Sequence, residues 1–226
     1  DETRKPSVPE LLAASEAVLL TSIQEGFGLP YLEAATARRP LIARLLPNIA
    51  PDLDTFGFRF PQAYAELLVP TVLFDWKRER ARQERFFREW LRLLPHTLRR
   101  QVVKPIALAS VQPPSAVPFS RLTLTAQLEI LTVPVKESWP ACAALNPFLK
   151  TWRRRARIGK LRTTPWPRTA DQWLGPTAYA RRFVRLLHAR QHASAEGNPA
   201  LSTQRDLLAK TFATANQYPL LWRLRT

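Results

Sequence analysis

The sequence predicts an α/β fold with parallel strands, followed by a mostly α-helical and strongly basic extension. Short apolar runs that suit buried strands, joined through a glycine-containing turn and a helix, indicate the α/β part. Charge indicates the extension. Residues 1–70 contain six Lys/Arg and nine Asp/Glu, a balance of −3, whereas residues 71–226 contain 28 and nine, a balance of +19. We therefore predict two regions, 1–70 and 71–226, with different surfaces.

The first region contains the signals of a strand–helix–strand unit. Ser7 and Glu10 have the spacing of a capping box and predict the start of a short helix. The apolar run at 17–22 predicts a strand that is buried on both faces. After a glycine turn, Pro30 is well placed in the first turn of a helix. The run at 39–43 completes the unit and predicts a second strand parallel to the first.

The turn between the first strand and this helix carries the candidate ligand-binding residues. Gly26 and Gly28 permit a positive φ and a close approach of the backbone to a ligand. The N-terminus of the following helix favours a phosphate group. We expect Glu33 in the first helical turn, where its carboxylate can lean back and accept hydrogen bonds from sugar hydroxyls. Glu25 ends the strand at the edge where open α/β sheets bind ligands.

These features fit a nucleotide-sugar, in which a diphosphate joins two polyhydroxylated rings. Taken singly, each residue also has a plainer interpretation: the glycines shape a turn, one acid complements the helix dipole and the other is solvated. Their combination is what indicates a binding site.

The segment SIQEGFGLPYLEAATARRPLIA, followed by LPNIAPDLDTFGFRFP, resembles the donor-binding segment of the retaining glycosyltransferases of the GT-B fold, the family-four group. The hallmark of that group is a Glu, seven residues and a second Glu, with Gly-Phe-Gly after the first. Glu25 and Glu33 match this spacing, and Gly26, Phe27 and Gly28 match the loop. The resemblance implies that the first region is part of a Rossmann-like domain.

The resemblance also implies a role for each residue. Glu25 would contact hydroxyls of the donor sugar and is the candidate catalytic residue. Backbone N–H groups around Phe27, Gly28 and Leu29 would hold the diphosphate or the sugar, and Glu33 would bind the ribose hydroxyls. The implied reaction transfers a hexose from a UDP-, GDP- or ADP-sugar with retention of configuration. The loop would stabilise the leaving diphosphate, and no cofactor or metal is implied.

The sequence departs from the family in two places and covers only part of it. Arg39 replaces the usual glycine before the proline of the second strand, and Pro47 stands where a glycine pair is usual. Asn48, in the same turn, is interpreted mainly as a turn former. The resemblance spans about residues 7–62. Such enzymes carry an acceptor-binding domain before this segment, and the sequence contains no methionine. We therefore expect a C-terminal piece that binds a nucleoside diphosphate weakly and transfers no sugar by itself.

The second region predicts several further elements. Asp75 and Ser120 are expected to cap helices. The expected elements are helices at 74–95, 120–131, 176–191 and 203–222, and a strand at 104–111. The helix at 176–191 is amphipathic and basic, which suits either packing against neighbouring helices, the favoured interpretation, or a membrane interface.

The basic stretch at 150–168 interleaves arginines with Trp152 and Trp166, a pattern that also occurs in nucleic-acid binding. Because no nucleic-acid motif accompanies it, we favour a solvated face, or docking on an anionic membrane surface or another domain. His188 and His192 are four residues apart but lack a third ligand, so no metal site is predicted.

The single Cys142 is interpreted as a buried small side chain and fits a reducing cytoplasm, with membrane association left open. Two other functions stay open: a non-catalytic module that binds anionic polymers or nucleic acid, and a sugar phosphorylase of the GT-B fold.

Overall fold

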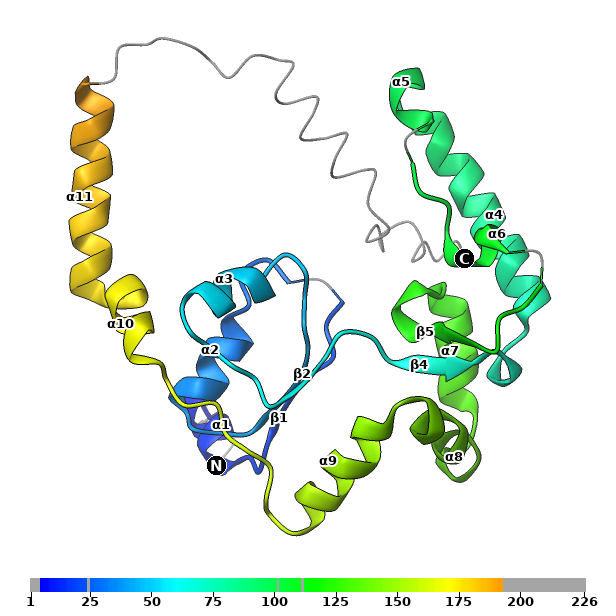
Figure 1. The fold of residues 1–226 in the computed structure, drawn as a ribbon, viewed down its shortest axis with the longest axis horizontal. Helices are drawn as coiled ribbons and strands as arrows, with labels where there is room; N and C mark the ends of the chain where they lie inside the picture. The colour runs from blue at the N-terminus through cyan, green and yellow to red at the C-terminus, as the bar shows by residue number, and fades with distance from the viewer. Residues whose placement is uncertain (1–4, 24, 101, 111, 193–226) are drawn as a thin grey trace. The chain divides into compact units, whose positions relative to one another are not determined.

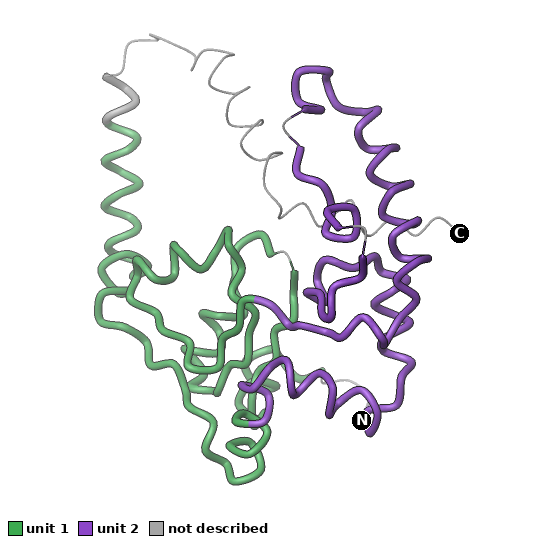
Figure 2. The backbone as a smooth tube through the Cα atoms, turned by 45° about the vertical axis from the view of Figure 1, so that its right-hand side comes forward, with its two compact units in different colours: residues 1–65, 151–194 green, residues 66–150, 195–226 purple. Residues whose placement is uncertain are grey.

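The computed structural model describes residues 5–23, 25–100, 102–110 and 112–192. They form a mixed α/β structure that divides into two compact units (Figures 1 and 2). Of the described residues, those up to 65 and from 151 onward belong to unit 1, and those from 66 to 150 belong to unit 2. The chain thus leaves unit 1 close to the predicted boundary at residue 70 and later returns to it. The assignment of residues 1–70 to donor binding stays a prediction.

Unit 1 contains a three-stranded parallel sheet in the order β1-β2-β3. The strands are β1 (Val18–Leu20), β2 (Leu41–Arg44) and β3 (Gln62–Tyr64). Val18 pairs with Leu41, and Ile42 pairs with Gln62. The parallel strand–helix–strand unit predicted from the sequence is thereby confirmed.

The helices of unit 1 include the three that the sequence predicted, after the capping box, after the glycine turn and at 176–191. They are α1 (Val8–Ala14), α2 (Leu29–Thr36), α3 (Ala50–Thr55), α10 (Arg168–Leu174) and α11 (Pro176–His192), and α9 (Pro147–Arg157) begins in unit 2 and ends in unit 1. The capping box of α1 is formed, because Glu10 N donates to Ser7 Oγ at 3.4 Å and Ser7 N donates to Glu10 Oε2 at 2.8 Å. Pro30 lies in the first turn of α2, as predicted.

The core of unit 1 lies between α2 and one face of the sheet. Tyr31, Ala34 and Ala35 of α2 are buried and belong to the same cluster as Leu20. The prediction that the first strand is buried on both faces is wrong, because Leu19 is 68% exposed. Successive side chains of a strand point to opposite faces, so the described residues cover only one face of β1.

Residues of the basic extension complete unit 1. The buried Gln62 side chain bonds Arg162 in both directions: Nε2 donates to the Arg162 carbonyl at 2.7 Å, and Arg162 N donates to Oε1 at 3.1 Å. Thr164 Oγ1 donates to the Arg59 carbonyl at 3.0 Å. These bonds connect segments about a hundred residues apart in the sequence. A local sequence pattern cannot predict such a contact.

Unit 2 is mainly helical around a two-stranded antiparallel sheet. Its elements are β4 (Leu68–Pro70), η1 (Thr71–Leu73), α4 (Trp76–Leu93), α5 (His96–Arg99), α6 (Ile106–Ala109), β5 (Ala116–Pro118), η2 (Phe119–Arg121), α7 (Leu124–Thr132) and α8 (Val135–Leu145). Asp75 caps α4 by accepting a hydrogen bond from Arg78 N at 3.0 Å, as predicted. Cys142 packs against the core of this unit, and partial burial raises the pKa of its thiol.

Two predictions for unit 2 are wrong. The segment at 104–111 contains helix α6 instead of a strand, and its turn is fixed from outside because Arg80 Nη1 donates to the Ala107 carbonyl at 3.0 Å. Helix α7 is capped by Thr123 instead of Ser120. Ser120 Oγ donates to Glu66 Oε2 at 2.6 Å, so this hydroxyl serves a contact distant in sequence.

A fully buried carboxylate joins α4 to the start of α7. Glu79 accepts hydrogen bonds from Thr123 N at 2.7 Å and from Gln83 Nε2 at 2.6 Å, and also from the Thr123 hydroxyl. Arg82 Nε donates to it at 3.1 Å. The charge of Glu79 is therefore matched by four donors.

The remaining predicted helices have different outcomes. The helix expected at 176–191 is present as α11. The helix expected at 203–222 lies outside the described residues. Among the helices that the structure describes, none combines the length and the apolar character needed to cross a membrane.

Candidate functional site

The predicted donor loop lies at the carboxyl end of β1, between that strand and α2. Because β1 and β2 are parallel, the turn after β2 emerges at the same edge of the sheet. The two turns are bonded to each other, since Asn48 Nδ2 donates to the Glu25 carbonyl at 3.0 Å. Asn48, interpreted from the sequence as a turn former, therefore also holds the backbone of the candidate loop.

Gly28 occupies a position that only glycine fits. It is the N-cap of α2 in the left-handed conformation, with φ +71° and ψ 26°. A Cβ at this position would lie 2.6 Å from Cγ2 of the buried Ile49. Gly26 differs, because no atom lies within 4 Å of the place that a Cβ would take there. Of the two predicted glycines, Gly28 is thus the one required by both conformation and space.

The carboxylate of Glu25 is half-buried and held in place. Ser22 Oγ donates to Glu25 Oε1 at 2.6 Å. Sequence analysis missed Ser22, although its position was a usable signal: a hydroxyl stands three residues before the acid, at the end of the run that predicted the strand. Ser22 and Asn48 fix the side chain and the carbonyl of Glu25 respectively.

Glu33 lies just past the first helical turn in which the sequence analysis placed it. Helix α2 begins at Leu29, so Glu33 is its fifth residue and the first turn contains no acid. The reason is that Gly28 is the N-cap, which places Pro30 second. Glu33 is half-buried, and none of the residues that the structure describes bonds its carboxylate. Helical side chains lean toward the N-terminus, so Glu33 still extends toward the loop.

The loop offers backbone N–H groups to a ligand. In the described part of the chain, the N–H groups of Phe27, Gly28 and Leu29 have no backbone acceptor. Such groups at the start of a helix carry partial positive charge. The side chain of Phe27 is 84% exposed, so the ring points into solvent and does not cover the N–H groups of the loop.

Tyr31 anchors α2 beneath the loop. Its hydroxyl donates to the Arg44 carbonyl at the end of β2, and its ring meets Phe60 edge-on at 5.1 Å between centroids. Burial raises the pKa of Tyr31 to about 12.

This raised pKa predicts a loss of stability at high pH. Above pH 10 the tyrosine of the unfolded chain ionises first, and this ionisation lowers the free energy of the unfolded state while the folded state keeps a neutral hydroxyl. Between pH 10 and about 12 the free energy of unfolding should fall by about 2 to 3 kcal/mol more in the wild type than in Tyr31→Phe. Urea titrations of both proteins across this range measure the difference. If the free energy of unfolding falls equally with pH in the wild type and in Tyr31→Phe, the prediction is wrong.

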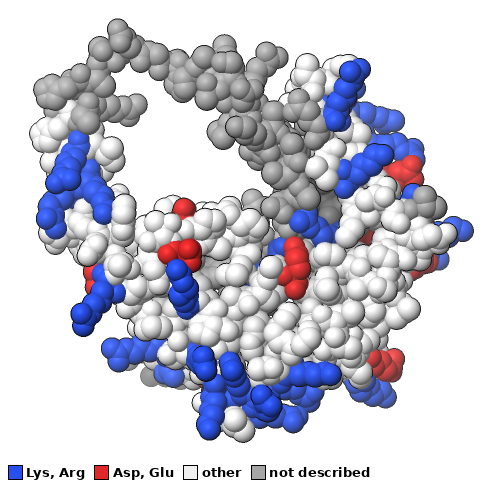
Figure 3. Space-filling view, in the orientation of Figure 1, with Lys and Arg blue, Asp and Glu red and all other residues white. Residues whose placement is uncertain are grey.

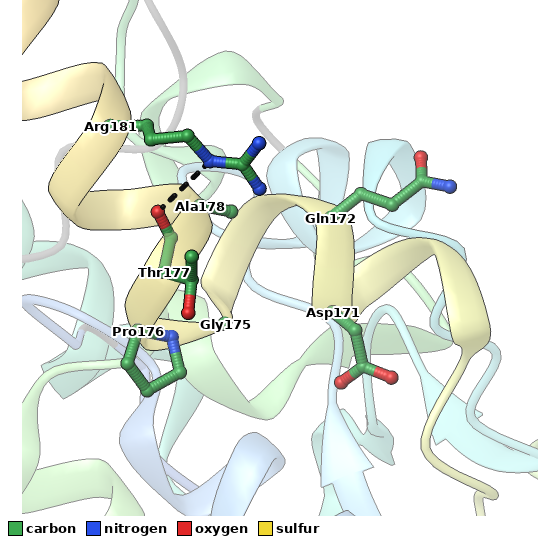
Figure 4. Close-up of a pocket in the computed structure, with 7 residues that line it drawn as sticks. All are labelled: Asp171, Gln172, Gly175, Pro176, Thr177, Ala178 and Arg181. Carbon is green, nitrogen blue, oxygen red and sulfur yellow. Dashed lines mark hydrogen bonds between the residues drawn. The ribbon is translucent and has the colours of Figure 1, made fainter.

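Two hollows in unit 1 lie elsewhere. One, of about 600 Å³, is lined by Ala35, Thr36, Arg38, Thr163, Thr164, Pro165 and Trp166. The other, of about 400 Å³, lies at the junction of α10 and α11 and is lined by Asp171, Gln172, Gly175, Pro176, Thr177, Ala178 and Arg181 (Figure 4). There Arg181 Nε donates to the Thr177 carbonyl at 3.4 Å. Neither hollow is lined by the predicted donor residues, which lie on the open loop.

Comparison of the chain with models of protein families, with curated proteins and with solved structures gives no match.

Proposed function

We propose that residues 7–62 form the donor-binding part of a retaining glycosyltransferase of the GT-B fold, which transfers a hexose from a nucleotide-sugar. One observation carries the proposal. The glycine turn at the carboxyl edge of parallel strands begins α2 through a left-handed Gly28, with Glu25 before it and Glu33 on the helix after it. This places anion-binding N–H groups between two carboxylates, as a nucleotide-sugar requires.

Each part of the loop then has a distinct role. The N–H groups of Phe27, Gly28 and Leu29, which lack backbone acceptors in the described structure, bind the diphosphate. Glu33 accepts hydrogen bonds from the ribose hydroxyls. Glu25 accepts from hydroxyls of the transferred sugar.

The proposed chemistry uses the loop to stabilise charge. As the bond between the sugar and the diphosphate breaks, negative charge grows on the departing phosphate oxygen. Preorganised N–H donors and the helix dipole stabilise that charge without reorganising. The acceptor hydroxyl attacks from the face that the diphosphate leaves and gives its proton to the departing phosphate oxygen, so the configuration of the sugar is retained. Ser22 and Asn48 act as positioning residues for Glu25.

Nucleotide binding tests the proposal. Calorimetry with UDP, GDP and ADP should detect weak binding of at least one, and Glu33→Ala should weaken it about tenfold or more, because two charge-assisted hydrogen bonds are lost. Glu16→Ala, which changes an exposed acid before β1, is the matched control and should leave the affinity unchanged.

Polyanion binding separates this proposal from a module that binds anionic polymers. Such a module would bind heparin or RNA with a steep salt dependence and would be indifferent to Glu33→Ala. If the wild type binds no nucleotide, or if Glu33→Ala and Glu16→Ala bind alike, the proposal fails.

A further inference from the structure

One side of α11 is apolar and exposed. The residues that form this apolar side are Tyr179, Phe183, Val184, Leu186 and Leu187, each between 48% and 69% exposed. Their spacing places them along one stripe of the helix. An apolar stripe of this length on a helix surface indicates contact with something other than water.

The opposite side of α11 is cationic. Its charge comes from Arg181 and Arg185, which lie on the same side as the polar His188, and residues 176–192 contain no acid. Figure 3 shows blue side chains gathered along this helix. The surrounding segment has the same sign, because residues 151–192 contain eleven Lys/Arg and one acid, Asp171.

Helix α11 contacts α10 through Arg182, which lies neither on the apolar side nor on the cationic side. The guanidinium of Arg182 lies 3.9 Å from the centroid of the Trp173 ring. Arg182 also donates to the Gln172 carbonyl at 2.9 Å and to the Trp173 carbonyl at 3.1 Å. Helix α10 is itself fixed through Ala170, which is buried in the core of unit 1. The helix is thus attached through Arg182, while its apolar side is left exposed.

We propose that α11 lies in the interface of a membrane that contains anionic lipids. Its apolar side enters the boundary between head groups and acyl chains, and Arg181 and Arg185 attract the lipid phosphates. Charge decides between a membrane and a second copy of the chain. Two copies that joined these apolar sides would bring two basic segments together, whereas an anionic surface complements them. This inference does not depend on the proposed transferase function.

Vesicle sedimentation with the full chain tests the proposal. The chain should sediment with vesicles of equal parts phosphatidylcholine and phosphatidylglycerol, and far less with phosphatidylcholine alone. The double variant Leu186→Glu/Leu187→Glu should bind at least about tenfold more weakly, because two apolar side chains become charged. The double variant Arg181→Gln/Arg185→Gln should lose about fivefold for each arginine. The control Leu131→Glu/Val135→Glu changes two exposed apolar residues of unit 2 and should bind like the wild type.

A fluorophore reports whether the helix enters the membrane. In a Cys142→Ala background, an environment-sensitive label attached at Leu186→Cys should shift to the blue with anionic vesicles. The same label at His188→Cys, on the cationic side, should shift much less.

Three outcomes would overturn the proposal. These are absence of vesicle binding, binding that is unchanged in Leu186→Glu/Leu187→Glu, and equal shifts at the two labelled positions. A dimer that this double variant dissociates, in a chain that ignores vesicles, would assign the apolar side to a second copy instead.

Discussion

The Gly28→Ala substitution should lower the free energy of unfolding by about 3 kcal/mol. Two causes add together. An alanine in the left-handed conformation costs about 1 to 2 kcal/mol, and its Cβ would lie 2.6 Å from Ile49 Cγ2. Ile49 is buried, so relieving this overlap costs about 1 to 3 kcal/mol more. Urea unfolding followed by circular dichroism measures the change.

Two other glycines separate these causes. Gly159 has φ +62° but open space around a Cβ, so Gly159→Ala should show the conformational cost alone. Gly26 has neither constraint, and Gly26→Ala should change the free energy of unfolding by less than about 1 kcal/mol. The expected order of destabilisation is Gly28, Gly159, Gly26. If Gly28→Ala and Gly159→Ala lower the free energy of unfolding equally, the overlap with Ile49 does not contribute to the effect at Gly28.

The second large effect is expected at Glu79, in unit 2. Glu79→Ala should lower the free energy of unfolding by about 3 to 5 kcal/mol, because buried donors of Thr123, Gln83 and Arg82 lose their shared acceptor. Glu79→Gln should be nearly as harmful. Glutamine has nearly the same volume as glutamate, but its side-chain NH₂ group would face the donors that Glu79 now accepts from. Urea midpoints and slopes of both variants provide the measurement.

Glu84 is the matched control on the same helix. It pairs with Arg88 at 2.6 Å, and both side chains are largely exposed. Glu84→Ala should therefore change the free energy of unfolding by less than about 0.5 kcal/mol. If Glu79→Ala changes the free energy of unfolding as little as Glu84→Ala, the prediction is wrong, and water must accept the hydrogen bonds that Glu79 accepts in the wild type.

Short-range signals predicted much of the fold. The capping pair Ser7 and Glu10, the cap Asp75 and the helix-starting Pro30 all act within four residues of their own backbone. Such interactions are present in the sequence itself. The parallel pairing of β1 and β2 also followed, since a strand–helix–strand unit has few alternatives.

Long-range contacts caused the errors. The Ser120 hydroxyl bonds Glu66 instead of capping a helix, and the carbonyl of Ala107 in α6 is bonded by Arg80. Leu19 looked like a core residue because its strand is apolar, yet burial depends on what covers the second face. None of these partners can be located from the neighbouring sequence.

The positions of the candidate residues along the chain were predicted, whereas their role in donor binding stays a prediction. Glu25, Gly28 and Glu33 occupy one loop and helix, as their spacing indicated. The positioning bonds of Ser22 and Asn48 were missed, since the turn holding Asn48 is brought to Glu25 only by parallel strand pairing.

The return of the chain to unit 1 has a consequence for its biosynthesis. Gln62 finds its partner in Arg162, and Arg59 finds its partner in Thr164, only after all of residues 66–150 have left the ribosome. Domains generally fold as they emerge, and distant contacts form late. Residues 66–150 are therefore expected to fold before unit 1 is complete. The sheet of unit 1 is synthesised earlier, but its bonds to Arg162 and Thr164 can form only later. A nascent chain arrested near residue 150 would lack the Arg162 backbone groups that bond the buried Gln62 side chain, and its unit 1 should be less stable for that reason.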